Sequence, residues 1–333
     1  MLLRTTDDST VPHHLLVGPD THGVTRYAGE VAAAAGAPVV REAAELRVGA
    51  PVHVHVTDRL FSRTPAEAAE ALEALARRVR LTVTLHDVPQ PTDGPVFAAR
   101  AAAYGRIVRA SHAWATNSRH EHALVERWSA PGASGSVIPL PIVSTTPGAP
   151  RAHGAVDEPV LGVFGYVYPG KGHRHVVRAA AALRRSGVMA RVRVLGGAAP
   201  GHDDEVDVLR TTSRARGVPV EVSGRVPEAD VVRVLRQVDV AVAAHRNVSA
   251  SGSMNSWIAA GRRPLVRDSA YAREMAALRP GTIVLFDDSS LVPALARALA
   301  DPGSTWLAPG TDVGPRLEQT AEAYRAWWAT VGA

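Results

Sequence analysis

The chain has 333 residues, of which 46% are hydrophobic, and this length and composition suit two globular domains of ordinary size. Its net charge is +5, but the basic residues are spread along the whole sequence and only 5% of residues are aromatic, so no nucleic-acid partner is expected. The lack of cysteine excludes disulfides, thiolate metal ligands and cysteine nucleophiles.

The sequence predicts neither a membrane span nor a secretory signal. No apolar run is long enough to cross a bilayer, and the first eight residues, MLLRTTDD, lack the apolar stretch of a signal peptide. We therefore expect a cytoplasmic protein, with peripheral contact to an anionic membrane surface as an open alternative.

The first half of the chain alternates short apolar runs with helical patterns. Strands are expected at residues 13–17, 52–56, 81–85, 113–116 and 137–142, and helices at 24–35, 66–79, 96–108 and 117–128. This alternation predicts βαβ units and a parallel sheet.

The second half repeats the same rhythm after residues 144–158, whose Ser, Thr, Pro, Gly and Ala are typical of a linker. Strands are expected at 160–164, 192–195, 220–222, 238–243, 264–266 and 283–286, with a helix at 173–186 and a last one at 313–331. Trp327 and Trp328 of that last helix are interpreted as packing residues, because a terminal helix must dock to be ordered.

These elements predict an α/β protein with two tandem doubly wound Rossmann-like domains that face a cleft. The expected parts are an acceptor domain at 1–143, a linker at 144–158, a donor domain at 159–312 and a C-terminal helix at 313–333 that docks back.

The most informative stretch follows the first strand of the second half. Gly165, Gly170 and Gly172 lie between an apolar run and a helical pattern, so the backbone can approach an anion at the start of the helix. Lys171 lies among them, and it is the only lysine among 37 basic residues. A flexible ammonium kept in a chain otherwise rich in arginine indicates a phosphate site.

At this point the whole chain resembles the retaining glycosyltransferases of family 4, which have the GT-B fold. Five stretches carry the resemblance in order: GPDTHGVTRYA at 18–28, VTLHDVP at 83–89, TNS at 116–118, FGYVYPGKG at 164–172 and AAGRRPLV at 259–266. The resemblance implies transfer of a sugar from a nucleotide diphosphate sugar to an acceptor hydroxyl, with retention, without a metal and without any other cofactor.

The resemblance also implies roles for single residues. Lys171 would bind the donor diphosphate together with Gly165, Tyr166 and Gly172, and it is a candidate catalytic residue because it would stabilise the leaving charge. Gly23 would lie against the donor phosphate and the acceptor. The second catalytic candidate, His86, would lie near the transferred sugar.

Two features depart from the family pattern. The family's phosphate-loop arginine is missing, and so are its paired glutamates, which would fall at Val248 and Ser256. The sequence has hydroxyls and glycine just before a helix instead, where they can cap the helix or donate to an anion. The candidate donor-binding residues there are Ser251, Gly252, Ser253, Asn255 and Ser256.

Three histidine pairs, at 53/55, 120/122 and 173/175, were weighed as metal ligands. Only the first pair, on a strand, shares a face, and no acidic or cysteine cluster completes a ligand shell. No metal site is expected.

Two alternatives and the acceptor remain open. The missing glutamates allow a non-catalytic partner of an active transferase, and a sugar-nucleotide epimerase with this fold is a further alternative. The acceptor is expected to be a small or lipid-linked hydroxyl compound. A lipid-facing basic surface would use Arg100, Arg106, Arg109 and Arg119, and the competing interpretation is a solvated face balanced by acidic neighbours.

Overall fold

The computed structural model describes residues 11–143 and 158–333. The chain forms two compact units, one running to Pro141 and completed by Pro315–Ala333, the other comprising Ile142–Gly314. Each unit is described by itself. The predicted linker at 144–158 lies outside the described residues except for Glu158.

The first unit contains a six-stranded parallel sheet in the order β2-β1-β3-β4-β5-β6. Its strands are β1 (His13–Leu15), β2 (Val39–Val40), β3 (Pro51–Val56), β4 (Arg80–Leu85), β5 (Ala113–Thr116) and β6 (Ser136–Val137). Its helices are α1 (Gly23–Ala35), α2 (Asp58–Phe61), α3 (Pro65–Ala76), α4 (Phe97–Ala110), α5 (Arg119–Leu124) and α12 (Leu317–Val331). The strand order reverses between β1 and β3, which makes this pair the switch point of the sheet.

Local sequence explains these elements. Thr64 caps α3 by accepting from the Glu67 amide, Pro65 fits its first turn, and Ala68, Leu72 and Leu75 are buried at helical spacing. The expected helix at 117–128 divides into α5, capped by Ser118, and a π-helical turn at Val125–Ser129. The other predicted elements are found, but the strand expected at 137–142 is only the two-residue β6 and the strand expected at 13–17 ends at Leu15. The short strand β2 and the short helix α2 were not predicted.

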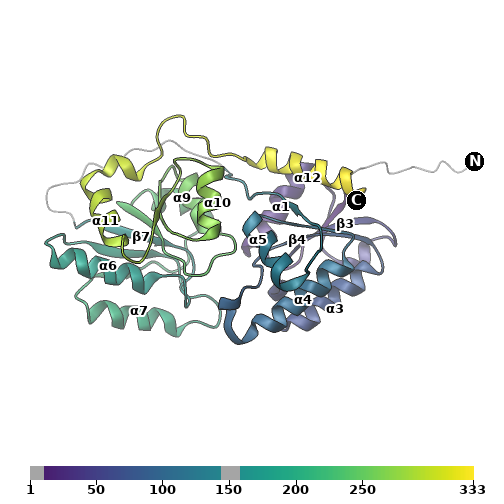
Figure 1. The fold of residues 1–333 in the computed structure, drawn as a ribbon, viewed down its shortest axis with the longest axis horizontal. Helices are drawn as coiled ribbons and strands as arrows, with labels where there is room; N and C mark the ends of the chain where they lie inside the picture. The colour runs from purple at the N-terminus through teal and green to yellow at the C-terminus, as the bar shows by residue number, and fades with distance from the viewer. Residues whose placement is uncertain (1–10, 144–157) are drawn as a thin grey trace, which may run out of the picture. The chain divides into compact units, whose positions relative to one another are not determined.

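The C-terminal helix α12 packs against α1 of the same unit (Figure 1). Trp327 and Trp328 are buried with Tyr324 among Tyr27 and Val31. The prediction that both tryptophans are packing residues of a docked helix is confirmed.

The second unit contains another six-stranded parallel sheet, in the order β12-β11-β10-β7-β8-β9. Its strands are β7 (Val160–Phe164), β8 (Arg191–Leu195), β9 (Val220–Val222), β10 (Val240–Ala243), β11 (Leu265–Arg267) and β12 (Val284–Phe286). Its helices are α6 (His173–Arg185), α7 (Asp204–Arg214), α8 (Val231–Leu235), α9 (Gly252–Ala259), α10 (Ala270–Leu278) and α11 (Leu291–Ala300). All six predicted strands are confirmed, and the strand order reverses between β7 and β10.

Two of the four arginines considered for a basic surface on the first unit are paired with carboxylates. Arg100 is buried, and its guanidinium pairs with the carboxylates of Asp58, Asp87 and Asp93. Arg106 donates to both carboxylate oxygens of Glu73 at 2.7 and 2.8 Å. Tertiary contacts neutralise these two side chains, which helical spacing alone could not reveal.

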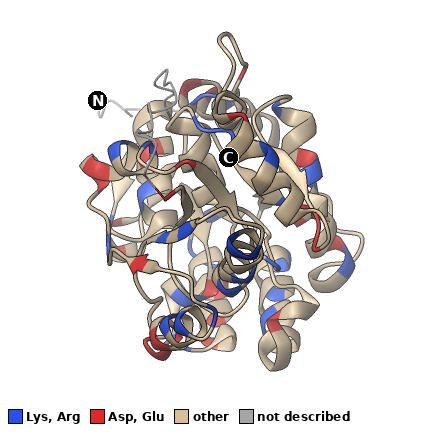
Figure 2. Ribbon diagram, turned by 90° about the vertical axis from the view of Figure 1, so that its left-hand side faces the viewer, with Lys and Arg blue, Asp and Glu red and all other residues tan. Residues whose placement is uncertain are grey.

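Charged positions of both signs are interspersed on the helices and loops visible in Figure 2. Within the described part of the chain, no helix is long and apolar enough to cross a membrane.

Removing the buried indole of Trp328 should destabilise the protein strongly. We expect Trp328→Ala to lower the free energy of unfolding by about 3–5 kcal/mol, because it leaves a cavity between α12 and the sheet. Trp128 is 38% exposed, so Trp128→Ala is the matched control and should cost less than about 1 kcal/mol. Urea unfolding measures both; equal losses would contradict the packing role of Trp328.

Candidate functional site

The candidate site lies where the loops after β7 and β10 meet, at the switch point of the second sheet. Gly172 is the N-cap residue of α6 and has φ 91°, and a Cβ there would lie 2.1 Å from the carbonyl oxygen of Ala244. The Arg246 amide donates to the Gly170 carbonyl at 2.8 Å. Only glycine permits this close approach, so the two loops are held together by backbone contact.

Lys171 points into this junction and is buried. Its Nζ donates to Ser253 Oγ at 3.0 Å and hydrogen-bonds to Nε2 of His245. Burial lowers the pKa of Lys171 to about 7. Burial, followed by the nearby charge of Lys171, lowers the pKa of His245 well below its usual value, so His245 is the neutral acceptor.

The start of α9 supplies the hydroxyl side of the site. Ser251 caps the helix by accepting from the Met254 amide at 3.2 Å, and its Oγ lies 3.3 Å from Ser253 Oγ. Gly252 is exposed at the first helical position. Of the remaining two candidates, Asn255 is buried and Ser256 Oγ donates to the Gly252 carbonyl at 3.0 Å. Ser253 is therefore the one of these candidates with a hydrogen bond to the lysine, and the Ser251 hydroxyl lies beside it.

The predicted loop residues before the lysine occupy different environments. Gly165 has φ 105°, and a Cβ there would lie 3.1 Å from Lys171 Nζ, so this glycine leaves room for the ammonium. Tyr166 is 55% exposed and has no part in the lysine contacts. A Cβ on Gly196, after β8, would lie 2.1 Å from the Gly165 carbonyl oxygen, so a second glycine fixes the path of the loop.

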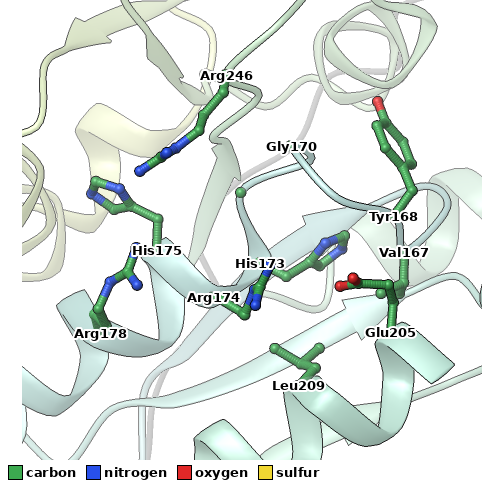
Figure 3. Close-up of a pocket in the computed structure, with 11 residues that line it drawn as sticks. Val167, Tyr168, Gly170, His173, Arg174, His175, Arg178, Glu205, Leu209 and Arg246 are labelled. Atoms are coloured by element: carbon green, nitrogen blue, oxygen red, sulfur yellow. The ribbon is translucent and has the colours of Figure 1, made fainter. Parts of the chain in front are cut away.

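A pocket of about 300 Å³ lies beside this loop and is lined by Gly170 and Gly172, although not by Lys171. Figure 3 shows Arg246, His175 and Arg178 together at one end and Tyr168 with Glu205 at the other. His175 Nδ1 lies 3.3 Å from a carboxylate oxygen of Asp288. The pocket is thus mainly basic, but the most buried cation of the region is directed to Ser253 and His245.

The two candidates of the first unit lie close to each other. Gly23 is the exposed first residue of α1, and His22 caps that helix. His86 follows β4; burial, with a smaller effect of His22, lowers its pKa to about 3. Its Nε2 hydrogen-bonds to Nδ1 of His55 at 2.9 Å. His86 is therefore a neutral hydrogen-bonding group at physiological pH, while Gly23 and His86 belong to a different unit from Lys171.

His245 is the site residue that the sequence analysis missed. It comes two residues after β10, and a single polar residue at the end of an apolar run is its only sequence signal. Its contact partner lies 74 positions earlier, so only the fold joins the two.

The arrangement can bind an anion. Among the described residues, no carboxylate forms an ion pair with Lys171, and the N-termini of α6 and α9 both begin beside it. A buried cation without a counter-charge is costly, and an anionic ligand would supply that charge.

Replacing the buried ammonium by an isosteric apolar side chain should stabilise the ligand-free protein. Since the folded-state pKa of Lys171 is about 7 and its ordinary value is 10.5, the folded state bears the full cost of charging below pH 7. That cost disappears as pH rises towards 10.5. We expect Lys171→Met to raise Tm by several degrees at pH 6 and by progressively less above pH 7. A gain in Tm that does not depend on pH would contradict the buried charge.

No protein-family model and no curated protein matches the chain. Solved structures do match. Anabaena HepE in complex with UDP and glucose has a TM-score of 0.66 at 15% identity over 97% of both chains. Sucrose-phosphate synthase from Thermosynechococcus elongatus has a TM-score of 0.62 at 14% identity, over 84% of this chain and 70% of that one.

A third similar structure is the UDP-forming α,α-trehalose-phosphate synthase from Burkholderia vietnamiensis. It has a TM-score of 0.57 at 15% identity, over 94% of this chain and 74% of that one. Identity at this level shows the fold alone. The chain has the α/β fold of these proteins, with two parallel six-stranded sheets and flanking helices, which is the GT-B fold.

Proposed function

We propose that the protein is a glycosyltransferase that moves a sugar from a nucleotide diphosphate sugar to an acceptor hydroxyl. The observation that carries the proposal is the buried Lys171 ammonium, which Ser253 and His245 hold beside two helix N-termini and which has no carboxylate partner within residues 11–143 and 158–333. A diphosphate has the charge that this position lacks. UDP or UDP-glucose in complexes of the similar HepE structure supports the choice of ligand class.

In the proposed reaction, the bond between the sugar and the diphosphate breaks and negative charge grows on the leaving phosphate. Lys171 and the amides at the starts of α6 and α9 would stabilise that charge. Retention follows if the acceptor attacks from the same face and the leaving phosphate takes its proton, so no carboxylate nucleophile is needed. Positioned cations and amides would take the role that a metal has in other transferases, which is why we propose a metal-independent transfer.

The other predicted residues take secondary roles in this proposal. Ser251 and Ser253 would donate to phosphate or sugar oxygens, as weaker neutral replacements for the missing glutamates. In the first unit, Gly23 and His86 remain the proposed contacts to the acceptor and the transferred sugar, with His86 acting as a neutral hydrogen-bonding group.

The comparisons do not favour the two alternatives. An epimerase needs acid/base carboxylates, and Lys171 has none among its described partners. A non-catalytic partner would not need a buried lysine, which lowers stability unless it meets a ligand.

For the acceptor we propose a small hydroxyl compound. The lipid-linked alternative requires a basic face on the first unit. Arg100 and Arg106 form ion pairs with carboxylates, so they do not contribute to such a face. The protein should therefore sediment equally little with anionic and neutral vesicles. Salt-sensitive binding to anionic vesicles alone would restore the lipid-linked acceptor and the peripheral membrane location.

Donor binding and turnover test the proposal directly. UDP-, GDP-, ADP- and dTDP-sugars are screened by calorimetry and by release of the nucleoside diphosphate; failure of all of them at millimolar concentration would refute it. With the donor that binds, Lys171→Ala should lower kcat/KM by roughly two to four orders of magnitude, because it removes the charge partner of the leaving group. Arg185→Ala, at the far end of α6, is the control and should leave the rate unchanged.

Donor affinity should also depend on pH through Lys171. In the free protein its pKa is about 7, and diphosphate binding favours the charged form, so binding takes up a proton above pH 7. We expect the Kd of the nucleoside diphosphate to rise up to about tenfold per pH unit between pH 7 and 9. Lys171→Arg, which stays charged, should bind more weakly but with a flat profile. Parallel profiles would exclude Lys171 as the group that titrates.

A further inference from the structure

Three buried histidines meet on one face of the first unit's sheet. The parallel register of β1 and β3 pairs His14 with His53, and His55 follows two residues later on the same face. Ring centroids lie 5.1 Å apart for His14 and His53, and 4.9 Å apart for His53 and His55. One ring nitrogen from each residue lies within 4.8 Å of the other two. The sequence pattern does not join His14 to the pair at 53 and 55, because His14 and His53 are far apart in the sequence and become neighbours only in the sheet.

Several of these nitrogens are buried without a partner. Both ring nitrogens of His14 and Nε2 of His55 make no hydrogen bond. Burial lowers the pKa of His14 to about 4 and lowers those of His53 and His55 well below the usual value, so the three rings are neutral. Neutral imidazoles with free lone pairs are the form that binds metal ions.

Hydrogen bonds from neighbouring residues orient the rings of His53 and His55. Thr82 Oγ1 donates to the Val52 carbonyl at 3.3 Å, so it accepts from His53 Nδ1 at 3.0 Å and the lone pair of His53 is on Nε2. His53 Nε2 lies 3.2 Å from Thr84 Oγ1, and a metal ion would replace this hydroxyl as the partner of the lone pair. Nδ1 of His55 is engaged by His86 Nε2, which leaves Nε2 of His55. Such outer partners fix the tautomer and orientation of metal-binding histidines.

We infer that His14, His53 and His55 form a binding site for a divalent transition-metal ion of the zinc class. Three imidazoles suit Zn²⁺, Co²⁺, Ni²⁺ or Cu²⁺ better than the oxygen-seeking Mg²⁺ or Ca²⁺. Zinc–nitrogen bonds of about 2.0–2.1 Å in tetrahedral geometry place the ligand nitrogens about 3.4 Å apart, and the three ring nitrogens here already lie within 4.8 Å of one another. The site adjoins the proposed sugar contact through the hydrogen bond between His55 and His86, but no metal takes part in the proposed transfer chemistry.

The surroundings indicate a structural ion. The Trp328 ring lies 5.2 Å from His14 and 5.3 Å from His53, and the Tyr324 ring lies 5.5 Å from His53. The aromatic side chains of α12 therefore pack directly against these histidines. A metal ion that fixes them would stabilise the docked helix and, through it, the first unit.

Metal retention by the full-length protein tests the site. Wild type and His14→Phe are stripped with EDTA, given one equivalent of Zn²⁺ and passed through gel filtration. Wild type should retain about one zinc per chain and gain about 5 °C in Tm, while His14→Phe should retain less than about a tenth of that and gain nothing. His202→Phe, which changes a half-buried histidine of the second unit, should behave as wild type.

Cobalt provides a readout that does not depend on a folded variant. Co²⁺ bound by the three histidines should give visible absorption bands and quench the emission of Trp328, with both signals saturating at one equivalent. Zinc retained equally by wild type and His14→Phe would overturn the inference. So would a wild type that binds neither metal, since the histidines would then be core residues without an ion.

Discussion

The close approach of the loops after β7 and β10 is the constraint on which the candidate site depends. A Cβ on Gly172 would collide with the Ala244 carbonyl, so this contact exists only because the loop is glycine at that point. The same contact directs Lys171 towards Ser253 and His245, which come from the other loop. Without it the lysine would be an ordinary surface ammonium, with neither burial nor a shifted pKa.

Both units bury polar side chains at the strand pair where the sheet order reverses. In the second unit this pair is β7 and β10, which precede Lys171 and His245; in the first it is β1 and β3, which carry His14 and His53. Polar groups buried without full partners lower stability, so a chain keeps them where a ligand restores the balance. The geometry of parallel sheets makes such switch points the natural position for ligands.

The strands of the second unit were predictable because apolar runs such as Val160–Phe164 are long enough to stand out between glycine-rich turns. The two-residue strand β2 was not, since two residues hold no periodicity. At the site, Lys171 was predictable because it is the chain's only lysine and lies among spaced glycines. The role of His245 and the burial of Arg100 were not predictable, because both depend on contacts between distant positions. Local pattern predicts elements and loops well, but it does not predict which side chains meet.

The replacement of glutamates by neutral groups changes how the site can recognise a donor. A carboxylate beside Lys171 would form an ion pair with the ammonium in the free protein and would raise its pKa. Ser253 and His245 are neutral and have neither effect. Below pH 7, where Lys171 is charged, no carboxylate among its described partners weakens its attraction for an anion, and a bound anion would offset the cost of the buried charge. Neutral hydroxyls hold sugar or ribose oxygens less strongly than carboxylates do. Under the proposed function, recognition would accordingly rest on the diphosphate more than on the sugar.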